Sequence, residues 1–198
     1  CFGGYLDTDE VVIRYLTDLG THPEKVAFFT RGSSREVYAT YTEDGEAYVH
    51  NMERLLQNFE TAKQYVPEPK IKPADKKTSV GALFFGTTAS PCYEAVEMLA
   101  EEGHAIDTIR IRAFPFNNEV EKFIAEHDTV FVIEQNRDGQ LRRLLINECE
   151  LPPNKLISIL HYDGLPITAR SIAMSMRDSL AASKVTPIRR KTAKKVKS

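Results

Sequence analysis

Hydrophobic and polar residues follow two different rhythms along the chain. Between Asp44 and Pro67, apolar residues recur every three or four positions, which predicts one amphipathic helix. Asp44 is placed to cap this helix and Pro67 to end it. After residue 80, short apolar runs alternate with helical patterns. The predicted strands are 80–85, 108–113, 129–134 and 155–160, and the predicted helices are 91–102, 118–127, 138–148 and 168–182.

The helix starts carry recognisable capping residues. Ser90 precedes Pro91, a residue that favours the first helical position. Asn118 and Glu121 are spaced as a capping box, and Asp138 and Thr168 are candidate N-caps. Each of these four helices is therefore expected to begin at a defined residue.

Strands that alternate with helices of about ten residues predict an α/β fold. A mostly parallel sheet, covered by helices on both faces, gives three layers. The strand at 108–113 reads TIRIRA, with apolar and basic residues alternating. The face with the basic side chains is therefore expected to be exposed to solvent or to have those side chains paired.

Composition divides the chain into four parts. Residues 67–79 hold three prolines and four lysines, which predicts a linker. It separates residues 1–66 from an α/β domain at 80–183. Residues 184–198 carry seven basic residues and no acid, so the net charge of -2 combines an acidic body with a basic tail. We expect a solvated, disordered tail, and nucleic-acid binding is disfavoured because no aromatic residue interleaves the charges.

Several classes of protein are excluded or disfavoured. No apolar run among the 198 residues approaches the roughly 20 that span a bilayer. The three cysteines are far apart and the five histidines lack ligand spacing, so neither an iron–sulfur nor another metal site is expected. A reducing, cytoplasmic setting fits this cysteine usage. Because the first residue is Cys1 and no signal segment follows, we interpret the chain as part of a longer polypeptide.

Candidate site residues lie in the loops that follow the predicted strands, where open α/β sheets bind ligands. Gln135, Asn136 and Arg137 follow one strand, and His161 and Asp163 follow another. They are candidates for an interface or a ligand loop. The alternative is loop and cap hydrogen bonding, and the absence of a nucleophile elbow disfavours a catalytic triad.

A second candidate region precedes the first long helix. Arg31 and Arg35 lie four residues apart in a polar, glycine-containing stretch. A guanidinium there suits a carboxylate or a phosphate. Pairing of these arginines with Glu36 or Glu43 is an equal alternative.

Five stretches together resemble a known family. They are TRGSSREVYATYTEDG, NMERLLQNFETAKQYVP, IRIRAFPF, HDTVFVIEQNRDGQLRRLL and LHYDGLPITARSI. In this order they resemble the C-terminal part of the alpha subunit of 2-oxoacid:ferredoxin oxidoreductases, the 2-oxoglutarate type in particular. The resemblance runs from about residue 21 to about residue 175.

The resemblance implies a fold and a reaction. The holoenzyme would convert a 2-oxoacid and coenzyme A to acyl-CoA and carbon dioxide, and pass electrons to ferredoxin. Thiamine diphosphate, magnesium and an iron–sulfur cluster would lie outside this segment, with a beta subunit as partner. The segment would end a pyrimidine-binding-type domain and continue as a transketolase C-terminal-like domain with a five-stranded mixed sheet, of which four strands are located.

The implied role is an assembly domain that shapes access to the active site and is inactive alone. On this basis Arg31, Ser33, Ser34 and Arg35 are expected to line the approach of the oxoacid or coenzyme A. Relatives often have a histidine in this stretch, whereas this chain reads GSSREV. The alternative functions are a free-standing small-molecule or regulatory domain and a protein that binds nucleic acid through its tail.

Overall fold

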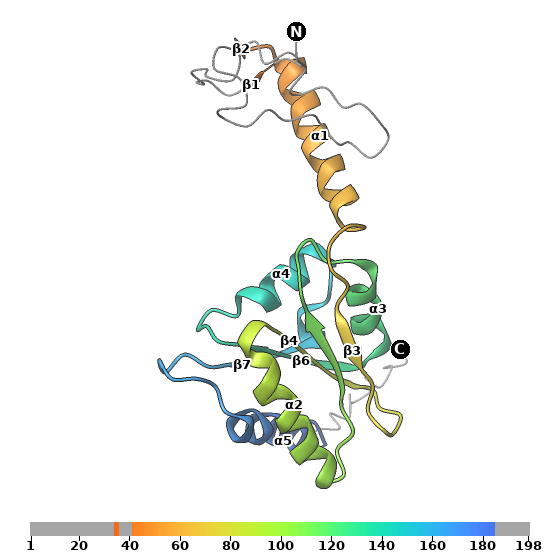
Figure 1. The fold of residues 1–198 in the computed structure, drawn as a ribbon, viewed down its shortest axis with the longest axis vertical. Helices are drawn as coiled ribbons and strands as arrows, with labels where there is room; N and C mark the ends of the chain where they lie inside the picture. Colours follow the sequence, from red (N-terminus) through yellow and green to blue (C-terminus); the bar gives the residue numbers. More distant parts are fainter. Residues whose placement is uncertain (1–33, 36–40, 185–198) are drawn as a thin grey trace, which may run out of the picture. The chain divides into compact units, whose positions relative to one another are not determined.

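The computed structural model describes residues 34–35 and 41–184. The chain divides into two compact units, Cys1–Pro67 and Glu68–Ser198 (Figure 1). In the first unit, β1 (Ser34–Arg35) pairs antiparallel with β2 (Tyr41–Thr42), and α1 spans Gly45–Ala62. Asp44 caps α1, because its Oδ2 accepts a 2.9 Å hydrogen bond from the backbone N–H of Ala47. The cap is as predicted, but the helix ends five residues before Pro67.

The described residues of the second unit form one five-stranded sheet with the strand order β3-β5-β4-β6-β7. Its strands are β3 (Lys70–Lys72), β4 (Val80–Phe85), β5 (Asp107–Ile111), β6 (Thr129–Glu134) and β7 (Leu156–Leu160). Four strands run parallel, and β3 pairs antiparallel with β5. The mixed sheet expected from the sequence is therefore present.

The fifth strand lies where the sequence predicts a linker. Lys70, Ile71 and Lys72 are all exposed and form the edge of the sheet. These three exposed residues lie between prolines and contain no apolar run, so the sequence pattern did not predict a strand here. The stretch 67–79 is thus partly structural.

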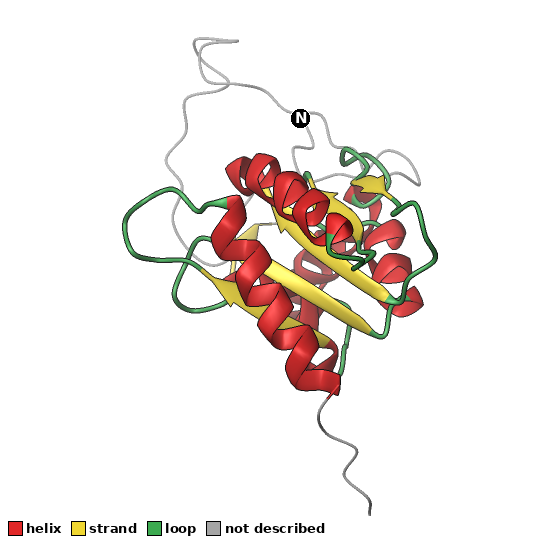
Figure 2. Ribbon diagram, turned by 90° about the horizontal axis from the view of Figure 1, so that it is seen from below, coloured by secondary structure: helices red, strands yellow, loops and turns green. Residues whose placement is uncertain are grey.

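Helices cover both faces of the sheet, which confirms the three-layer α/β/α fold (Figure 2). One core joins α2 (Ala89–Glu101) and α5 (Ala169–Lys184) to the face that carries Phe84 and Phe131. The other joins α3 (Asn118–Glu126) and α4 (Gln140–Glu148) to the face that carries Leu83 and Val132. Because β4 and β6 are buried on both sides, they read as continuous apolar runs.

The predicted start of α2 is wrong, and α3 begins at Asn118 as predicted but without the predicted cap. A 3₁₀ turn at Gly86–Thr88 leads directly into α2, which begins at Ala89 and not at Pro91. The N-cap of α3 is Asn117, and no side-chain cap hydrogen bond supports the predicted capping box. Thr168 does cap α5, since its Oγ1 accepts a 3.2 Å hydrogen bond from the N–H of Ser171.

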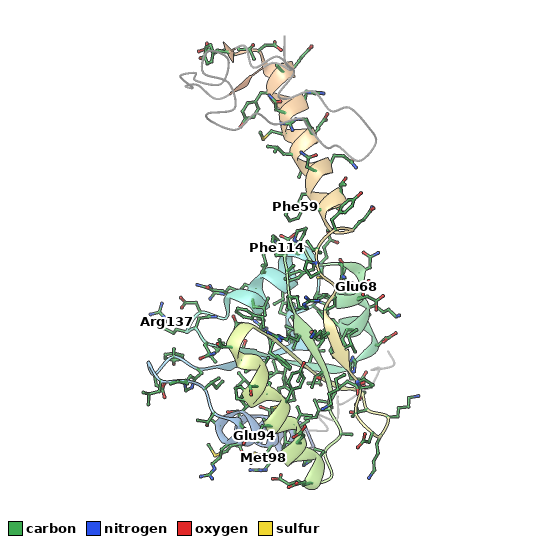
Figure 3. All side chains as sticks on the ribbon, in the orientation of Figure 1. Phe59, Glu68, Glu94, Met98, Phe114 and Arg137 are labelled. Atoms are coloured by element: carbon green, nitrogen blue, oxygen red, sulfur yellow. The ribbon has the colours of Figure 1, made fainter. Side chains whose placement is uncertain are left out.

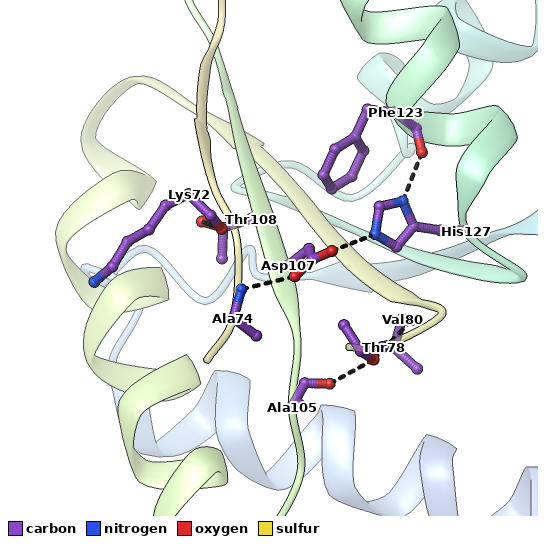
Figure 4. Close-up of polar contacts among 9 residues, drawn as sticks. All are labelled: Lys72, Ala74, Thr78, Val80, Ala105, Asp107, Thr108, Phe123 and His127. Carbon is purple, nitrogen blue, oxygen red and sulfur yellow. Dashed lines mark hydrogen bonds and ion pairs between the residues drawn. The ribbon is translucent and has the colours of Figure 1, made fainter. Parts of the chain in front are cut away.

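Asp107 fixes the β3–β4 connection to the sheet (Figure 4). Its Oδ1 accepts a 2.7 Å hydrogen bond from the N–H of Ala74, and its Oδ2 lies 3.0 Å from Nε2 of His127. The buried His127 ring also places Nδ1 2.6 Å from the carbonyl oxygen of Phe123. Nearby, the Thr78 hydroxyl donates to the Ala105 carbonyl at 2.8 Å. The connection is therefore anchored at several points.

Candidate functional site

The strand order creates a topological switch point between β4 and β6. The chain leaves β4 through α2 on one face of the sheet, and it leaves β6 through α4 on the other face. The two loops diverge where these adjacent parallel strands end. In open α/β sheets such a crevice is the usual place for a ligand.

Gln135 spans this crevice. Its Nε2 donates to Oγ1 of Thr88 at 3.1 Å and lies 3.3 Å from Oγ1 of Thr87. The loop after β6 is thereby tied to the 3₁₀ turn after β4. The structure brings the candidate loop after β6 against the turn after β4, and it lines their junction with an amide and two hydroxyls.

Glu134 organises the loop after β6, a role that the sequence pattern did not predict. Its side chain is completely buried. Oε2 accepts hydrogen bonds from the N–H of Leu141 at 2.8 Å and from Nδ2 of Asn136 at 2.7 Å, and Oε1 accepts from the N–H of Arg142 at 3.1 Å. The carboxylate therefore caps α4 from the strand before it, where the helix dipole favours a negative charge.

Asp138, the predicted cap of α4, does not cap it. The N-cap position is Gly139, whose φ of 61° lies in the left-handed region that favours glycine. Asp138 instead accepts a 2.8 Å hydrogen bond from Nε of Arg137. A signal for Glu134 was present in the sequence, since an acid that ends a buried apolar strand needs hydrogen-bond donors.

The three candidate residues of this loop have different surroundings. Asn136 serves the loop itself, because its Oδ1 accepts from the N–H of Asp138 at 3.1 Å while its Nδ2 binds Glu134. The Arg137 side chain is 75% exposed and extends into solvent (Figure 3). Arg137 is therefore the cation of this loop that a partner can reach.

His161 and Asp163 form a closed turn at the end of β7. Nε2 of His161 lies 2.8 Å from the carbonyl oxygen of Leu165 and 3.0 Å from Oδ1 of Asp163. The same Oδ1 accepts a 2.9 Å hydrogen bond from the N–H of Leu165. The turn starts beside the loop after β6, because the N–H of His161 donates to the Glu134 carbonyl at 3.1 Å. Both of these contacts of the His161 Nε2 atom therefore lie within the turn itself.

An apolar cavity of about 450 Å³ adjoins the crevice, at the ends of β4 and β5. Its apolar walls come from Phe85, Ile111, Phe114, Phe116, Leu141 and Leu144. Phe85 and Phe114 are 42% and 44% exposed, and the turn after β7 adds Tyr162 and Leu165, which are 64% and 70% exposed. The carboxyl edge of the sheet thus presents large apolar side chains to solvent.

The candidate binding residues before α1 cannot be assigned to a site at this edge. Arg31 and Ser33 lie outside the described residues, and Ser34 and Arg35 are described only as the backbone of β1 in the first unit. Their role stays a prediction.

The cysteine and metal-ligating side chains of the described residues are a further kind of candidate site. Within residues 34–35 and 41–184, no three His, Cys, Asp or Glu side chains are grouped so that they could hold a metal ion. Burial raises the pKa of the Cys92 thiol, which keeps it in the unreactive protonated form. No helix in the described part of the chain is long and apolar enough to cross a membrane.

Comparison with known proteins gives a consistent set of matches. No protein-family model matches the chain. The alpha subunit of 2-oxoacid:ferredoxin oxidoreductase 2 from Aeropyrum pernix is 29% identical over 150 residues, which cover 74% of this chain and 23% of that protein. This chain thus spans about a quarter of the length of the curated relative.

Comparison with solved structures gives, among other matches, one above and one below a TM-score of 0.5. The 2-oxoglutarate:ferredoxin oxidoreductase from Magnetococcus marinus, solved with 2-oxoglutarate, coenzyme A and succinyl-CoA bound, gives a TM-score of 0.74 at 17% identity, over 89% of this chain and 30% of that one. A split-gene transketolase gives a TM-score of 0.47 at 19% identity, over 57% of this chain and 41% of that one. The chain resembles the alpha subunit of 2-oxoacid:ferredoxin oxidoreductases in sequence, and an oxidoreductase of that kind in fold.

Proposed function

We propose that this chain is the C-terminal α/β part of the alpha subunit of a thiamine-dependent 2-oxoacid:ferredoxin oxidoreductase. The observation that carries the proposal is the 29% identity to the Aeropyrum pernix alpha subunit over 150 residues. The holoenzyme converts a 2-oxoacid and coenzyme A to acyl-CoA and carbon dioxide, with electrons passed to ferredoxin in the cytoplasm. The Magnetococcus marinus structure, which holds 2-oxoglutarate and coenzyme A, favours 2-oxoglutarate as the substrate.

Within the holoenzyme, this part serves assembly and access to the active site. The large exposed side chains at the carboxyl edge, Phe85, Phe114, Tyr162 and Leu165, support an interface there, because large apolar side chains exposed to solvent are typical of protein contacts. The loops after β6 and β7 at the same edge carry Gln135, Asn136, Arg137, His161 and Asp163, which would form its polar rim. The partner is the beta subunit. Arg31, Ser33, Ser34 and Arg35 line the approach of the oxoacid or coenzyme A.

The cofactors lie in other parts of the enzyme. Thiamine diphosphate with magnesium, and the iron–sulfur cluster, would be held by residues beyond this segment. The segment alone is therefore expected to be inactive.

The reaction is tested with the full-length protein that contains this segment, purified with its partner subunit. We expect ferredoxin reduction that requires a 2-oxoacid, coenzyme A and thiamine diphosphate, and none from residues 1–198 alone. Trials with 2-oxoglutarate, pyruvate and other 2-oxoacids identify the substrate. Turnover by residues 1–198 alone, or reduction independent of thiamine diphosphate, would contradict the proposal.

The interface role has a separate test. Phe114→Ser in the full-length protein should weaken association with the beta subunit about tenfold, because a buried aromatic anchor contributes more than 1 kcal/mol. Met174→Ser is the matched control, since Met174 is 54% exposed on α5. Equal association of both variants and the wild type, measured by analytical ultracentrifugation, would exclude Phe114 from the interface.

A free-standing binding domain is the second candidate. The switch point between β4 and β6, with the apolar cavity beside it, supports this alternative. It predicts that a small molecule, such as a nucleotide, raises the melting temperature of residues 1–198 in the absence of any partner subunit.

A further inference from the structure

Two strands with alternating basic residues lie side by side at one edge of the sheet. The antiparallel register pairs Lys70 of β3 with Arg110 of β5, and Lys72 with Thr108. Residues two apart on a strand share a face, so Lys70, Lys72 and Arg110 project on the same side. We call these three residues the basic strip. Nζ of Lys72 lies 5.7 Å from the centroid of the Tyr93 ring, so this side is the one that α2 covers.

The positive charge of the basic strip is only partly compensated. Glu97 on α2 lies 3.6 Å from Lys72, and the exposed Glu68 precedes β3. Among the ion pairs of the described residues, none includes Lys70 or Arg110. Nε of Arg110 is buried without a hydrogen-bond partner in this part of the chain.

This arrangement is unfavourable for the isolated protein. Like charges directly opposite each other on neighbouring strands destabilise a sheet. The chain apart from its last 15 residues carries a clear excess of acids, yet none pairs with Lys70 or Arg110 in the described structure. An anionic partner from outside would remove the repulsion.

The edge position limits what that partner can be. Among the described strands, β3 has only β5 as a hydrogen-bonded neighbour, so its outer side is open for pairing with a further strand. Ile71 projects to the opposite face from the two lysines and is 44% exposed. The edge therefore presents a basic, an apolar and a basic side chain in succession, with about 7 Å between the two lysine positions.

We propose that β3 accepts an extended segment of a partner protein as a sixth strand, in which acidic and apolar residues alternate. The acidic side chains face Lys70 and Lys72, and an apolar side chain covers Ile71. Strand addition supplies backbone hydrogen bonds, and the alternating side chains supply specificity. The docking of a strand on β3 does not depend on the proposed enzymatic function.

The opposing interpretation is that the lysines only protect the edge. Lysine on an edge strand discourages pairing with other strands. Protection predicts no binding of any strand. A site for a small anion predicts binding of inorganic phosphate without strand pairing.

The test uses residues 1–198 and three synthetic seven-residue peptides. The probe has the sequence Thr-Glu-Val-Glu-Val-Glu-Thr. One control peptide has Gln in place of every Glu, and the other has Pro in place of both Val residues. Affinity is measured by fluorescence anisotropy at two salt concentrations, and amide hydrogen exchange is followed at residues 70–72.

We expect the probe to bind more tightly than both control peptides and to slow exchange at residues 70–72. Lys70→Gln and Lys72→Gln should each weaken binding about two- to fivefold, as expected for one exposed charge pair. Lys122→Gln is the matched control and should bind as the wild type does, since Lys122 is an exposed lysine on α3.

Three outcomes would overturn the proposal. The Gln peptide or the Pro peptide could bind as tightly as the probe, the Lys70 and Lys72 variants could bind as well as the wild type, or inorganic phosphate could give the same protection at residues 70–72.

Discussion

At the scale of single residues, Gly81 lies in β4 beneath the ring of Phe123. A Cβ at this position would come within 2.7 Å of Cε1 and 2.9 Å of Cζ of that ring. The ring is buried and stacks on His127 with 4.2 Å between the ring centroids, so it has little room to move. Packing against the Phe123 ring therefore requires a glycine at position 81.

Gly81→Ala should lower the free energy of unfolding of the second unit by about 1–3 kcal/mol, the usual cost of overpacking a core. Urea denaturation followed by circular dichroism measures it. Gly45→Ala is the control, because a Cβ at Gly45 meets no atom within 4 Å. An unchanged midpoint for Gly81→Ala would show that the Phe123 ring can yield.

Glu134→Gln removes the charge that caps α4 while nearly preserving shape. The amide can accept through one oxygen only, so its N–H₂ group would face a backbone N–H. We expect a loss of about 1–3 kcal/mol, the range for a buried donor left unsatisfied. Asp138→Asn, at the cap predicted from the sequence, should cost less than about 0.5 kcal/mol.

The comparison of these two variants by thermal and urea unfolding separates the observed cap from the predicted one. A larger effect at Asp138 than at Glu134 would contradict the structure of this loop.

At the scale of elements, Glu102 and Arg177 join the end of α2 to α5. Nε of Arg177 donates to Oε2 of Glu102 at 2.8 Å, and Nη2 forms a second bond with Oε1. The hydrogen bond from Arg177 holds the pKa of the Glu102 carboxyl below its ordinary value. A carboxyl with a lowered pKa in the folded state stabilises that state above its unfolded pKa, and the contribution is lost as the pH falls through the folded value.

Glu102→Gln should therefore lower the melting temperature at neutral pH, and the difference from the wild type should disappear as the pH falls below about 4. Arg177→Gln should have the same effect, and the double variant should be no less stable than either single variant. Differential scanning calorimetry from pH 3 to pH 7 measures all three. A difference independent of pH would show that the link is not electrostatic.

The elements differ in how well the sequence predicts them. β4 and β6 have the predicted bounds because strands buried on both faces give unbroken apolar runs. β3 was missed because an exposed edge of three residues has no such run. The contact between Gln135 and Thr88 was not predictable, since it depends on β4 pairing with β6, and local patterns do not encode strand order.

At the scale of the whole molecule, the structure and the sequence place the start of the α/β domain differently. The second compact unit begins at Glu68, whereas composition predicts a start at residue 80. Residues 68–79 contribute β3, the hydrogen bond from Ala74 to Asp107 and that from Thr78 to Ala105. Without them, one side of β5 has no strand partner and Asp107 keeps only His127.

A fragment of residues 68–184 should accordingly unfold cooperatively, and a fragment of residues 80–184 should be less stable by about 2–4 kcal/mol, because several backbone partners are lost together. Urea denaturation of the two fragments measures the difference. Asp107→Asn in the longer fragment should reproduce part of the loss, since it weakens the contact with His127 while Oδ1 can still accept from Ala74. Equal stability of the two fragments would mean that β3 pairs with the sheet without adding to its stability. Residues 67–79 would then act as the linker that their composition predicts.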